Sequence, residues 1–455
     1  MTAADGYSTL QLCLAWAIVV WYIALWSLGL LGCRAARRRY RNRRPSPLAS
    51  ADASAVPGVS ILRPLKGLDT NLYENLESTF TQDYPNYEIF LCVADENDQA
   101  LPIVRDLMAK YPNVNARLMI GEELVGVNPK INNLMRSYRA AANDILWVLD
   151  SNVMVAPGTL AHSVEALDGP ADLPSSRRRI ALVHHVPFAW SSEYALGSRI
   201  EEAFLDTNHA KMYIAINTVA IDSCVMGKSN LYRRSDLERV DGSLKPIANA
   251  AEGGSQPGPK GLAAFGRFLA EDNMIAAALW HELGLRHELS CDVARNAVGN
   301  MSLADYIWRR VRWIRVRKHM VLAATLVEPF TESFMAGSLA AIGLRYLFGI
   351  TPWLFLPLHF ILWLLVDLDV CDSLSGQRAP LQARLAFIGA WSARESLAFP
   401  IWVFAVFGSE VEWRGRRYQV LRNGEVKLAH SEGNGWFGMG SRTSSRGYEP
   451  LEVSQ

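Results

Sequence analysis

The sequence predicts an α/β domain with a mostly parallel sheet, flanked by hydrophobic helices of the kind that cross membranes. Three observations favour this fold class. A nearly uncharged apolar run near the N-terminus is followed at once by a cluster of arginines. Short apolar β-like runs then alternate with helical segments, and this β-α-β order is typical of parallel sheets. Long apolar stretches return from residue 330 onward.

The first apolar run, residues 10–33, is long enough to cross a bilayer, which takes about 20 residues. No positive residue precedes it. The arginines that follow are Arg34, Arg37, Arg38, Arg39, Arg41, Arg43 and Arg44. A cleaved secretory signal carries its positive charge before the apolar region, so this order predicts an uncleaved anchor. Residues 1–9 are then expected in the lumen, and the basic, proline-rich linker of residues 34–57 in the cytosol.

Composition excludes some classes of function. Lys plus Arg number 46 and Asp plus Glu 45, so the chain has no overall charge that would favour nucleic acid. The six cysteines are scattered and form no CxxC pair, which indicates reduced thiols and neither a disulfide framework nor a zinc site. The central domain is therefore expected to face the cytosol.

The central domain is predicted to span residues 58–300. Its first half contains predicted strands at Val59–Pro64, Tyr87–Ala94, Ala116–Ile120 and Ile145–Leu149. Helical periodicity predicts helices around residues 72–80, 103–107 and 134–142, the first of them capped by Asp69 or Thr70. The second half is predicted to contain a helix at Glu201–Met212 and strands at Ile180–Val183, Thr218–Met226 and Arg286–Val298. Residues 243–260, rich in Gly, Pro and Ala, are expected to form a flexible insertion.

The C-terminal part returns to the membrane. Residues 301–320 are amphipathic and predict a helix in the membrane interface, and residues 321–410 form a membrane region with three apolar stretches. The last stretch, 385–407, contains Arg394 and Glu395, which are costly at bilayer depth, so we expect it to be re-entrant or interfacial. The polar tail of residues 411–455 begins with arginines that favour the cytosol, and its Gly/Ser-rich end is expected to be disordered.

Acidic residues stand where ligands collect in such folds. Asp95 and Asp150 each follow a β-like run directly, and ligands bind at the carboxyl ends of parallel strands. Asp272, beside Glu271, lies in an apolar helical run, where a raised proton affinity would suit a general base. The alternatives are that strand-end aspartates form turns and that the acidic pair only begins a helix.

Together with the basic cluster at residues 309–313, these acids predict transfer of a sugar from a nucleotide diphosphate. Arg309 and Arg312 would clamp phosphate oxygens, although such a helix can also contact lipid headgroups. Asp150 would hold Mg²⁺ or Mn²⁺ through oxygen. Asp272 would take the proton of the attacking hydroxyl. Taken singly, His209 and Cys224 fit core packing.

Asp95, Asp150, Asp272 and the run Arg309-Arg310-Val311-Arg312-Trp313 resemble the D, D, D, (Q/R)xxRW pattern of membrane-bound family 2-like glycosyltransferases. Further blocks, such as residues 63–67, 127–134 and 270–272, resemble the fungal-like ceramide glucosyltransferases of family 21. The resemblance covers residues 59–418. One departure is that Asp150-Ser151-Asn152 lacks the second acid of a DxD motif.

This resemblance implies a GT-A-like (Rossmann-like) catalytic domain on the cytosolic face of a multi-pass Golgi, or ER, membrane protein. It implies inverting transfer of glucose from UDP-glucose to the primary hydroxyl of ceramide, giving β-glucosylceramide, the first step of glycosphingolipid synthesis. It also implies roles for particular residues: Asp272 as general base; Arg309, Arg312 and Trp313 closing the site; Asp95, Lys130 and Asp150 on the nucleotide sugar, with the metal at Asp150; and His209 and Cys224 near the acceptor or inhibitor site.

Three other functions are each consistent with part of the sequence. A processive polysaccharide synthase would use the same acids but needs a channel, for which few clear spans remain. A transporter or scaffold with a degenerate nucleotide-sugar domain would normally show repeated membrane halves, and the sequence has no internal repeat. A two-carboxylate glycosidase leaves the arginines and the membrane anchor unexplained.

Overall fold

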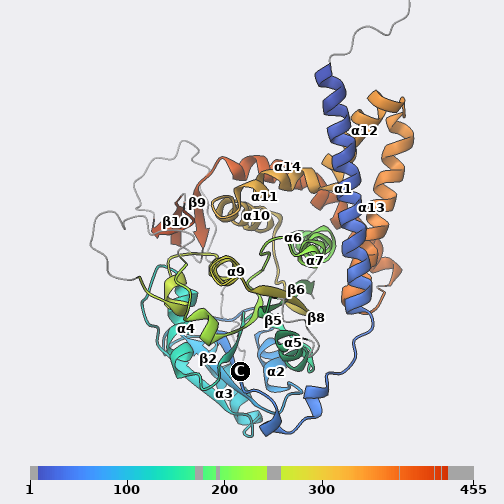
Figure 1. Ribbon diagram of the computed structural model, residues 1–455. Helices are drawn as coiled ribbons and strands as arrows, with labels where there is room; N and C mark the ends of the chain where they lie inside the picture. The colour runs from blue at the N-terminus through green and yellow to red at the C-terminus, as the bar shows by residue number, and fades with distance from the viewer. Residues whose placement is uncertain are drawn as a thin grey trace, which may run out of the picture.

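The computed structural model describes residues 9–169, 178–190, 195–242, 258–378, 380–413, 416–421 and 423–428. Most of the predicted insertion at residues 243–260, nearly all of the expected lumenal N-terminus and the end of the polar tail lie outside these residues. A mixed α/β domain forms the larger part, and helices α1, α12 and α13 extend away from it (Figure 1).

The sheet of this domain has eight strands in the order β3-β2-β1-β4-β7-β6-β8-β5. The four strands predicted first pair in parallel, and they are β1 (Val59–Pro64), β2 (Tyr87–Val93), β3 (Ala116–Ile120) and β4 (Ile145–Leu149). All residues of β4 are buried, which explains its unbroken apolar sequence. The prediction of a parallel α/β sheet is therefore confirmed for this half.

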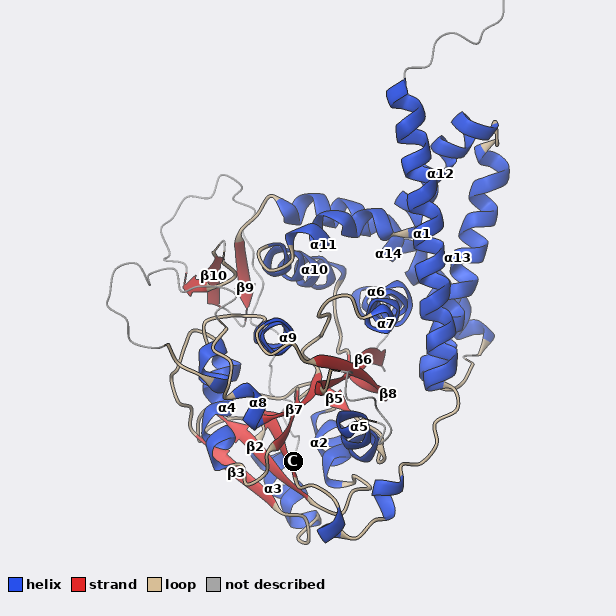
Figure 2. Ribbon diagram, viewed as in Figure 1, coloured by secondary structure: helices blue, strands red, loops and turns tan. Residues whose placement is uncertain are grey.

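Helices cover both faces of the sheet (Figure 2). One face carries α2 (Leu72–Phe80), α3 (Leu101–Lys110) and α5 (Thr159–Asp168), and the other carries α4 (Pro129–Ala140) and α9 (Glu271–His281). The predicted cap of α2 is wrong. Asn71, in the left-handed conformation at φ 54°, occupies that position, and the carboxylate of Asp69 instead accepts a hydrogen bond from Ser151 Oγ.

The second half of the sheet is mixed. It contains β5 (Val153–Met154), β6 (Ile180–Trp190), β7 (Ser229–Arg233) and β8 (Arg286–Ala297), and β7 runs antiparallel to β4 and to β6. Strand β6 is longer than its predicted four residues because it continues in parallel beside β8 as far as Trp190, with two irregularities in register.

The strand predicted at Thr218–Met226 is wrong. The chain there ends a helical stretch made of α6 (Leu196–Phe204), a π-helical turn (Leu205–His209) and α7 (Ala210–Val219), and it turns at Ala220 with φ 52°. Short apolar runs do not distinguish a strand from a buried helix. Packing decides here, because α7 lies so close to α1 that a Cβ on Gly32 would meet Lys211 O at 2.3 Å.

Two of the described helices are long and apolar enough to cross a membrane, namely α1 (Thr9–Tyr40) and α13 (Pro352–Ser375). The shorter α12 (Ser333–Phe348) packs beside α1, where Gly343 faces Ala15 and Val19. Helix α14 (Leu381–Val406) runs across the direction of α1 and α13 (Figure 1), which is the orientation expected of an interfacial helix.

The segment after the sheet packs against α6 and α14. Helix α10 (Leu303–Lys318) begins with a capping box between Ser302 and Asp305 and is followed by α11 (Leu322–Val327) and the 3₁₀ turn η5 (Glu328–Thr331). The start of the polar tail forms a small antiparallel sheet of β9 (Glu410–Trp413), β10 (Arg416–Val420) and β11 (Val426–Leu428).

Candidate active site

Asp272 lies in the first turn of α9, which the 3₁₀ turn η4 (Gly261–Phe265) precedes. The loop before β7 passes directly against it. A Cβ on Gly227 would come within 2.5 Å of Asp272 Cγ, so only glycine lets the backbone approach this carboxylate so closely. The apolar helix and the glycine together hold Asp272 in place.

Asp150 follows β4 and is held by two lysines. Lys130 Nζ lies 2.8 Å from Asp150 Oδ1, and Lys228 Nζ lies 3.2 Å from Asp150 Oδ2. Lys130 also lies 2.9 Å from Glu271 Oε1, so one ammonium group joins the end of β4 to the start of α9. Asn128 caps α4 by accepting a hydrogen bond from Lys130 N at 2.8 Å, which places Lys130 in the first turn.

The two aspartates have different proton affinities. Burial raises the pKa of Asp272, and the neighbouring Glu271 raises it further, to about 7, although Lys130 opposes the shift. Burial acts in the same direction on Asp150, but Lys130 and Lys228 hold its pKa down at about 2. One carboxyl can therefore exchange a proton near neutral pH while the other stays ionised, a division of roles common in active sites.

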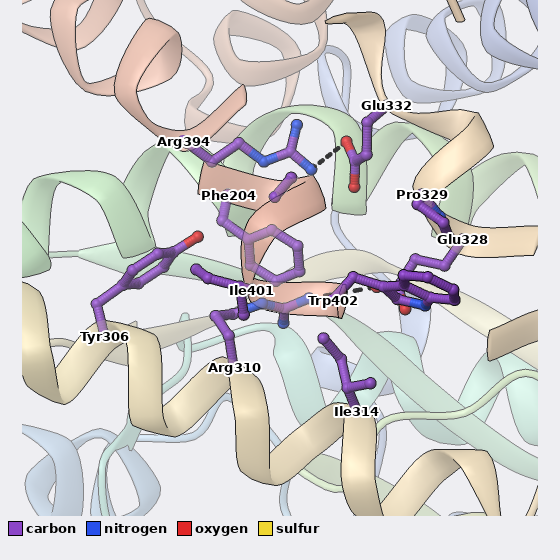
Figure 3. A pocket seen from close by; sticks show the side chains of 11 residues that line it. Phe204, Tyr306, Arg310, Ile314, Glu328, Pro329, Glu332, Arg394, Ile401 and Trp402 are labelled. Carbon is purple, nitrogen blue, oxygen red and sulfur yellow. Dashed lines mark hydrogen bonds and ion pairs between the residues drawn. The ribbon is translucent and has the colours of Figure 1, made fainter. Parts of the chain in front are cut away.

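The basic cluster of α10 faces the same region. Arg309 Nε lies 2.8 Å from Glu201 Oε1, and its guanidinium lies 4.9 Å from the Trp313 ring centre. Glu201 is fully buried on α6, so this ion pair fixes α10 against the domain. Arg310 lies 3.6 Å from the Phe204 ring centre and beside Glu328, and it also lines a small neighbouring pocket (Figure 3).

A single cavity of about 880 Å³ brings most of the predicted site residues together. Those that line it are Lys130, Asp150, His209, Cys224, Asp272, Arg309, Arg312 and Trp313. Asp95 does not line it. Its side chain is exposed and accepts a hydrogen bond from Asn97 N at 2.8 Å, as a turn-forming aspartate does, although the preceding Ala94 lines the cavity.

His209 and Cys224 stand in the wall of this cavity in neutral forms. His209 belongs to the π-helical turn and stacks on Tyr213 at 5.7 Å between ring centres. Burial and the nearby Arg310 lower its pKa to about 3, so the imidazole carries no charge. Burial raises the pKa of the Cys224 thiol to about 11, which leaves it protonated. Either group can therefore contact an uncharged ligand.

The sequence did not point to Lys228, Glu201 or Asn128. No local pattern marks Lys228 as a site residue, because residues 218–226 predict a strand that leads into it. Asn128 donates through Nδ2 to Glu271 Oε2 at 2.8 Å and so completes the contacts of that acid. A buried pair such as Glu201 with Arg309, 108 residues apart, leaves no local signal.

The donor atoms at Asp150 suit Mg²⁺ or Mn²⁺ in kind. Asp150 offers carboxylate oxygens and Asn152 an amide oxygen, the hard ligands that both ions prefer. Lysines hold these atoms in this structure, since Lys228 Nζ lies 3.1 Å from Asn152 Oδ1. An ion would therefore share Asp150 with Lys130 and Lys228 or displace them.

A second cluster of ligand-type side chains does not suit a metal. Among the described residues, His162, Cys291 and Asp292 have their ligand atoms within 4.8 Å of one another. The hydrogen bond of His162 Nδ1 to Asp292 Oδ2, at 2.6 Å, raises the pKa of His162 to about 11, and its Nε2 lies 2.8 Å from Arg44 O. Both ring nitrogens are thus donors of an imidazolium, which cannot bind a cation.

The fold and this site define a glycosyltransferase associated with the membrane. The model of Glycosyl transferase family 21 matches residues 18–252 and 258–426, and the chain belongs to this family. It is 37% identical to the ceramide glucosyltransferase of Komagataella phaffii, over 90% of each chain. It is 31% identical to that of Candida albicans, over 92% of this chain and 98% of the relative.

The chain is also similar to a further curated relative and to a solved structure. Ceramide glucosyltransferase 3 of Caenorhabditis elegans is 31% identical, over 82% of this chain and 75% of the relative. The mannosyltransferase of Pyrobaculum calidifontis, solved with GDP-Man and Mn²⁺, is 18% identical with a TM-score of 0.44, over 87% of this chain and 99% of that one.

Proposed function

We propose that this chain transfers glucose from UDP-glucose to the primary hydroxyl of ceramide and forms β-glucosylceramide. The observation that carries the proposal is the single cavity in which charged groups at Asp150 and Asp272 meet an apolar wall that includes residues of α1. A charged donor and a lipid acceptor need such a combination. Membership of family 21 and the printed activity of its relatives support the same reaction.

In this reaction the hydroxyl oxygen of the acceptor attacks C1 of glucose. The bond from C1 to the diphosphate oxygen breaks on the opposite face, and its electron pair leaves with UDP. Asp272 takes the hydroxyl proton, for which a pKa of about 7 is well placed. A single displacement inverts the configuration at C1, so an α-linked donor gives a β-linked product.

The cations of the site would bind and stabilise the diphosphate. Lys130 and Lys228 stand beside Asp150, and Arg309 and Arg312 line the cavity from α10. Positive groups that are already in position lower the barrier most where negative charge develops. Trp313 would close the site beside Arg309.

Asp150 and Asn152 would hold Mg²⁺ or Mn²⁺, which would supply further positive charge at the leaving group. We expect EDTA to lower turnover and added Mn²⁺ to restore it. Unchanged turnover in EDTA would mean that Lys130 and Lys228 supply this charge without a metal ion.

The remaining predicted residues would contact the nucleoside or the acceptor and would not take part in proton transfer. Asp95 would contact the nucleoside if its exposed side chain turned from Asn97 toward the cavity wall, in which Ala94 precedes it. His209 and Cys224 would contact the acceptor. The reaction would take place on the cytosolic face of a Golgi or ER membrane, where water-soluble UDP-glucose meets ceramide in the bilayer.

The test is an assay of membranes with UDP-glucose and a short-chain ceramide. We expect glucosylceramide from the wild type and a loss of about 10²- to 10⁴-fold in kcat for Asp272→Asn, because the variant has no general base. Asp106→Asn, on the exposed side of α3, is the matched control and should keep full activity. Absence of glucosylceramide from the wild type would contradict the proposal, and a polymeric product would favour a polysaccharide synthase.

A further inference from the structure

We propose that the acceptor lipid enters the site sideways from the bilayer, through an apolar mouth between α1, α7 and α11 that then holds its hydrocarbon chain. This inference rests on the proposed function, because it assigns the chain-binding part of the same site. It adds the route of the acceptor and the residues that select its length.

Side chains that both line the cavity and remain exposed mark where it opens. At one end these are polar, namely Lys66 after β1 and Glu122 after β3. At the other end most are apolar: Trp21 is 37% exposed, Ile216 38%, Val321 43% and Val327 41%. The exposed Asp222, just after α7, also lines the cavity and pairs with His281. The cavity therefore has a polar mouth on the domain and an apolar mouth beside the membrane helices.

The surroundings of the apolar mouth are also apolar. Exposed side chains that do not line the cavity flank it on α7, α11 and the turns that follow them, namely Val219, Ile221, Leu322, Leu326 and Phe330. Exposed apolar side chains in such number are unfavourable in water and suit a lipid environment. Since α1 is long and apolar enough to span, the mouth opens onto hydrocarbon.

One hydrogen bond ties the two sides of this mouth together. Trp21 Nε1 on α1 donates to Phe330 O on η5 at 3.1 Å. The apolar wall continues inward through Leu25 and Leu28 on α1 and Met212 on α7, in the same cavity that Asp272 lines. A hydrocarbon chain lying along this wall keeps its contact with apolar groups while its hydroxyl reaches Asp272.

This route explains how two substrates of opposite solubility share one site. The donor enters from water at the polar mouth, and the hydrocarbon chain of the acceptor stays against the apolar wall. On this route, side chains at the apolar mouth select the acceptor by the length of its hydrocarbon chain, away from the reacting atoms.

The test narrows the mouth and compares two acceptors with UDP-glucose in proteoliposomes. Ala324→Trp places a large ring on a position that lines the mouth, and we expect kcat/KM for a long-chain ceramide to fall about tenfold while that for a hexanoyl ceramide changes less than about twofold, because the short chain does not reach the ring. Leu322→Trp, exposed on the same helix but outside the cavity, should leave both values unchanged.

A second pair of variants, on α7, gives a test that does not depend on the folding of α11. Ile216→Trp lines the mouth from α7, and Val219→Trp is its exposed control on the same helix. Equal losses for both acceptors, or equal losses in variant and control, would overturn the lateral mouth.

A measurement without turnover separates this inference from the proposed function. A long-chain ceramide with a photoreactive group at its chain end should label Leu25, Leu28 or Val327, even if the sugar donor were another than UDP-glucose. Labelling confined to the outer surface of α12 and α13 would overturn the inference. Labelling at the mouth without glucosylceramide from the wild type would overturn the reaction and keep the lipid site.

Discussion

At the scale of single residues, charge balance at the reacting centre depends on Lys130. Its ammonium group contacts both Asp150 and Glu271, and it lowers the pKa of Asp272 from close by. Three carboxylates stand in this region against Lys130 and Lys228, so removing one lysine leaves like charges facing one another. Such an uncompensated buried charge shifts the proton affinity of its neighbours.

This balance predicts a pH dependence. We expect kcat/KM of the wild type to fall as pH falls through about 7, because protonated Asp272 cannot accept a proton. This fall is the acidic limb of the pH profile of kcat/KM. In Lys130→Met the acidic limb should move to higher pH, since the cation that lowers the pKa of Asp272 is gone. Rates measured between about pH 5.5 and 9 test both statements.

Lys110→Met is the matched control, since Lys110 is exposed on α3 and pairs with Glu77 away from the cavity. Its acidic limb should coincide with that of the wild type. A limb that stays in place in Lys130→Met would show that the titrating group is not Asp272.

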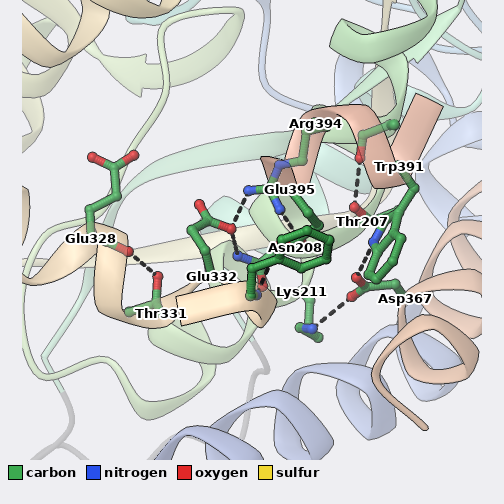
Figure 4. Close-up of polar contacts among 12 residues, drawn as sticks. Thr207, Asn208, Lys211, Glu328, Thr331, Glu332, Asp367, Trp391, Arg394 and Glu395 are labelled. Carbon is green, nitrogen blue, oxygen red and sulfur yellow. Dashed lines mark hydrogen bonds and ion pairs between the residues drawn. The ribbon is translucent and has the colours of Figure 1, made fainter. Parts of the chain in front are cut away.

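At the scale of elements, buried ion pairs hold α14 against the rest of the protein (Figure 4). Arg394 pairs with Glu395 and with Glu332, and Glu332 also accepts a hydrogen bond from Asn208 Nδ2 at 2.9 Å. Asn208 belongs to the π-helical turn that carries His209 into the cavity. This network therefore joins α14, the start of α12 and one wall of the site.

We expect Arg394→Met to lower the free energy of unfolding by about 3–5 kcal/mol, because Glu332 and Glu395 stay buried without their cation. Arg384→Met, also on α14, removes a pair with Asp372 of α13 that is more exposed than the Arg394 network, and it should cost less. Denaturant unfolding of both variants in detergent measures the difference. Similar losses in the two variants would mean that the buried network adds nothing beyond a surface pair.

At the scale of the whole molecule, the arginine-rich end of α1 lies against the α/β domain. Arg39 Nη2 lies 2.6 Å from Glu288 Oε1, and Arg43 Nη1 lies 3.1 Å from Asp292 Oδ1, both on β8. We therefore expect the domain to sit on the same side of a membrane as these arginines. Because positive residues favour the cytosolic side, the orientation of the whole domain follows from that of α1.

We expect a protease site inserted at Ala53, in the exposed linker, to be cut in sealed microsomes whose cytosolic face points outward. The same site inserted at residue 5 should be cut only after detergent opens the vesicles. The reverse pattern would place the domain in the lumen, where UDP-glucose from the cytosol would not reach it.

Much of the α/β domain could be predicted from local sequence. Strands β1, β3 and β4 have their predicted bounds because each is a short apolar run between polar or turn residues, and β2 ends one residue early. The strand predicted at Thr218–Met226 failed because α7 ends at Val219 and the remaining residues form a turn and a loop that pair with no strand. The cap of α2 failed because the carboxylate of Asp69 bonds Ser151 across the sheet instead.

The residues of the candidate site also fall into those that local sequence indicates and those that it does not. Residues adjacent to strand ends or in a dense motif, such as Asp150 and Trp313, could be picked out from sequence and line the cavity. Asp95 has the same local pattern as Asp150, yet its side chain points into a turn. Lys228 has no distinctive neighbours and nevertheless contacts Asp150.

The sequence by itself determined the order of strands and helices in the first half of the domain, the apolar run with its arginines, and the acids that end the strands, because each depends on residues only a few positions apart. The tertiary structure alone decided that α1, α7 and α11 wall one cavity with Asp272. Contacts such as Trp21 with Phe330, 309 residues apart, exist only once hydrophobic packing has brought those helices together.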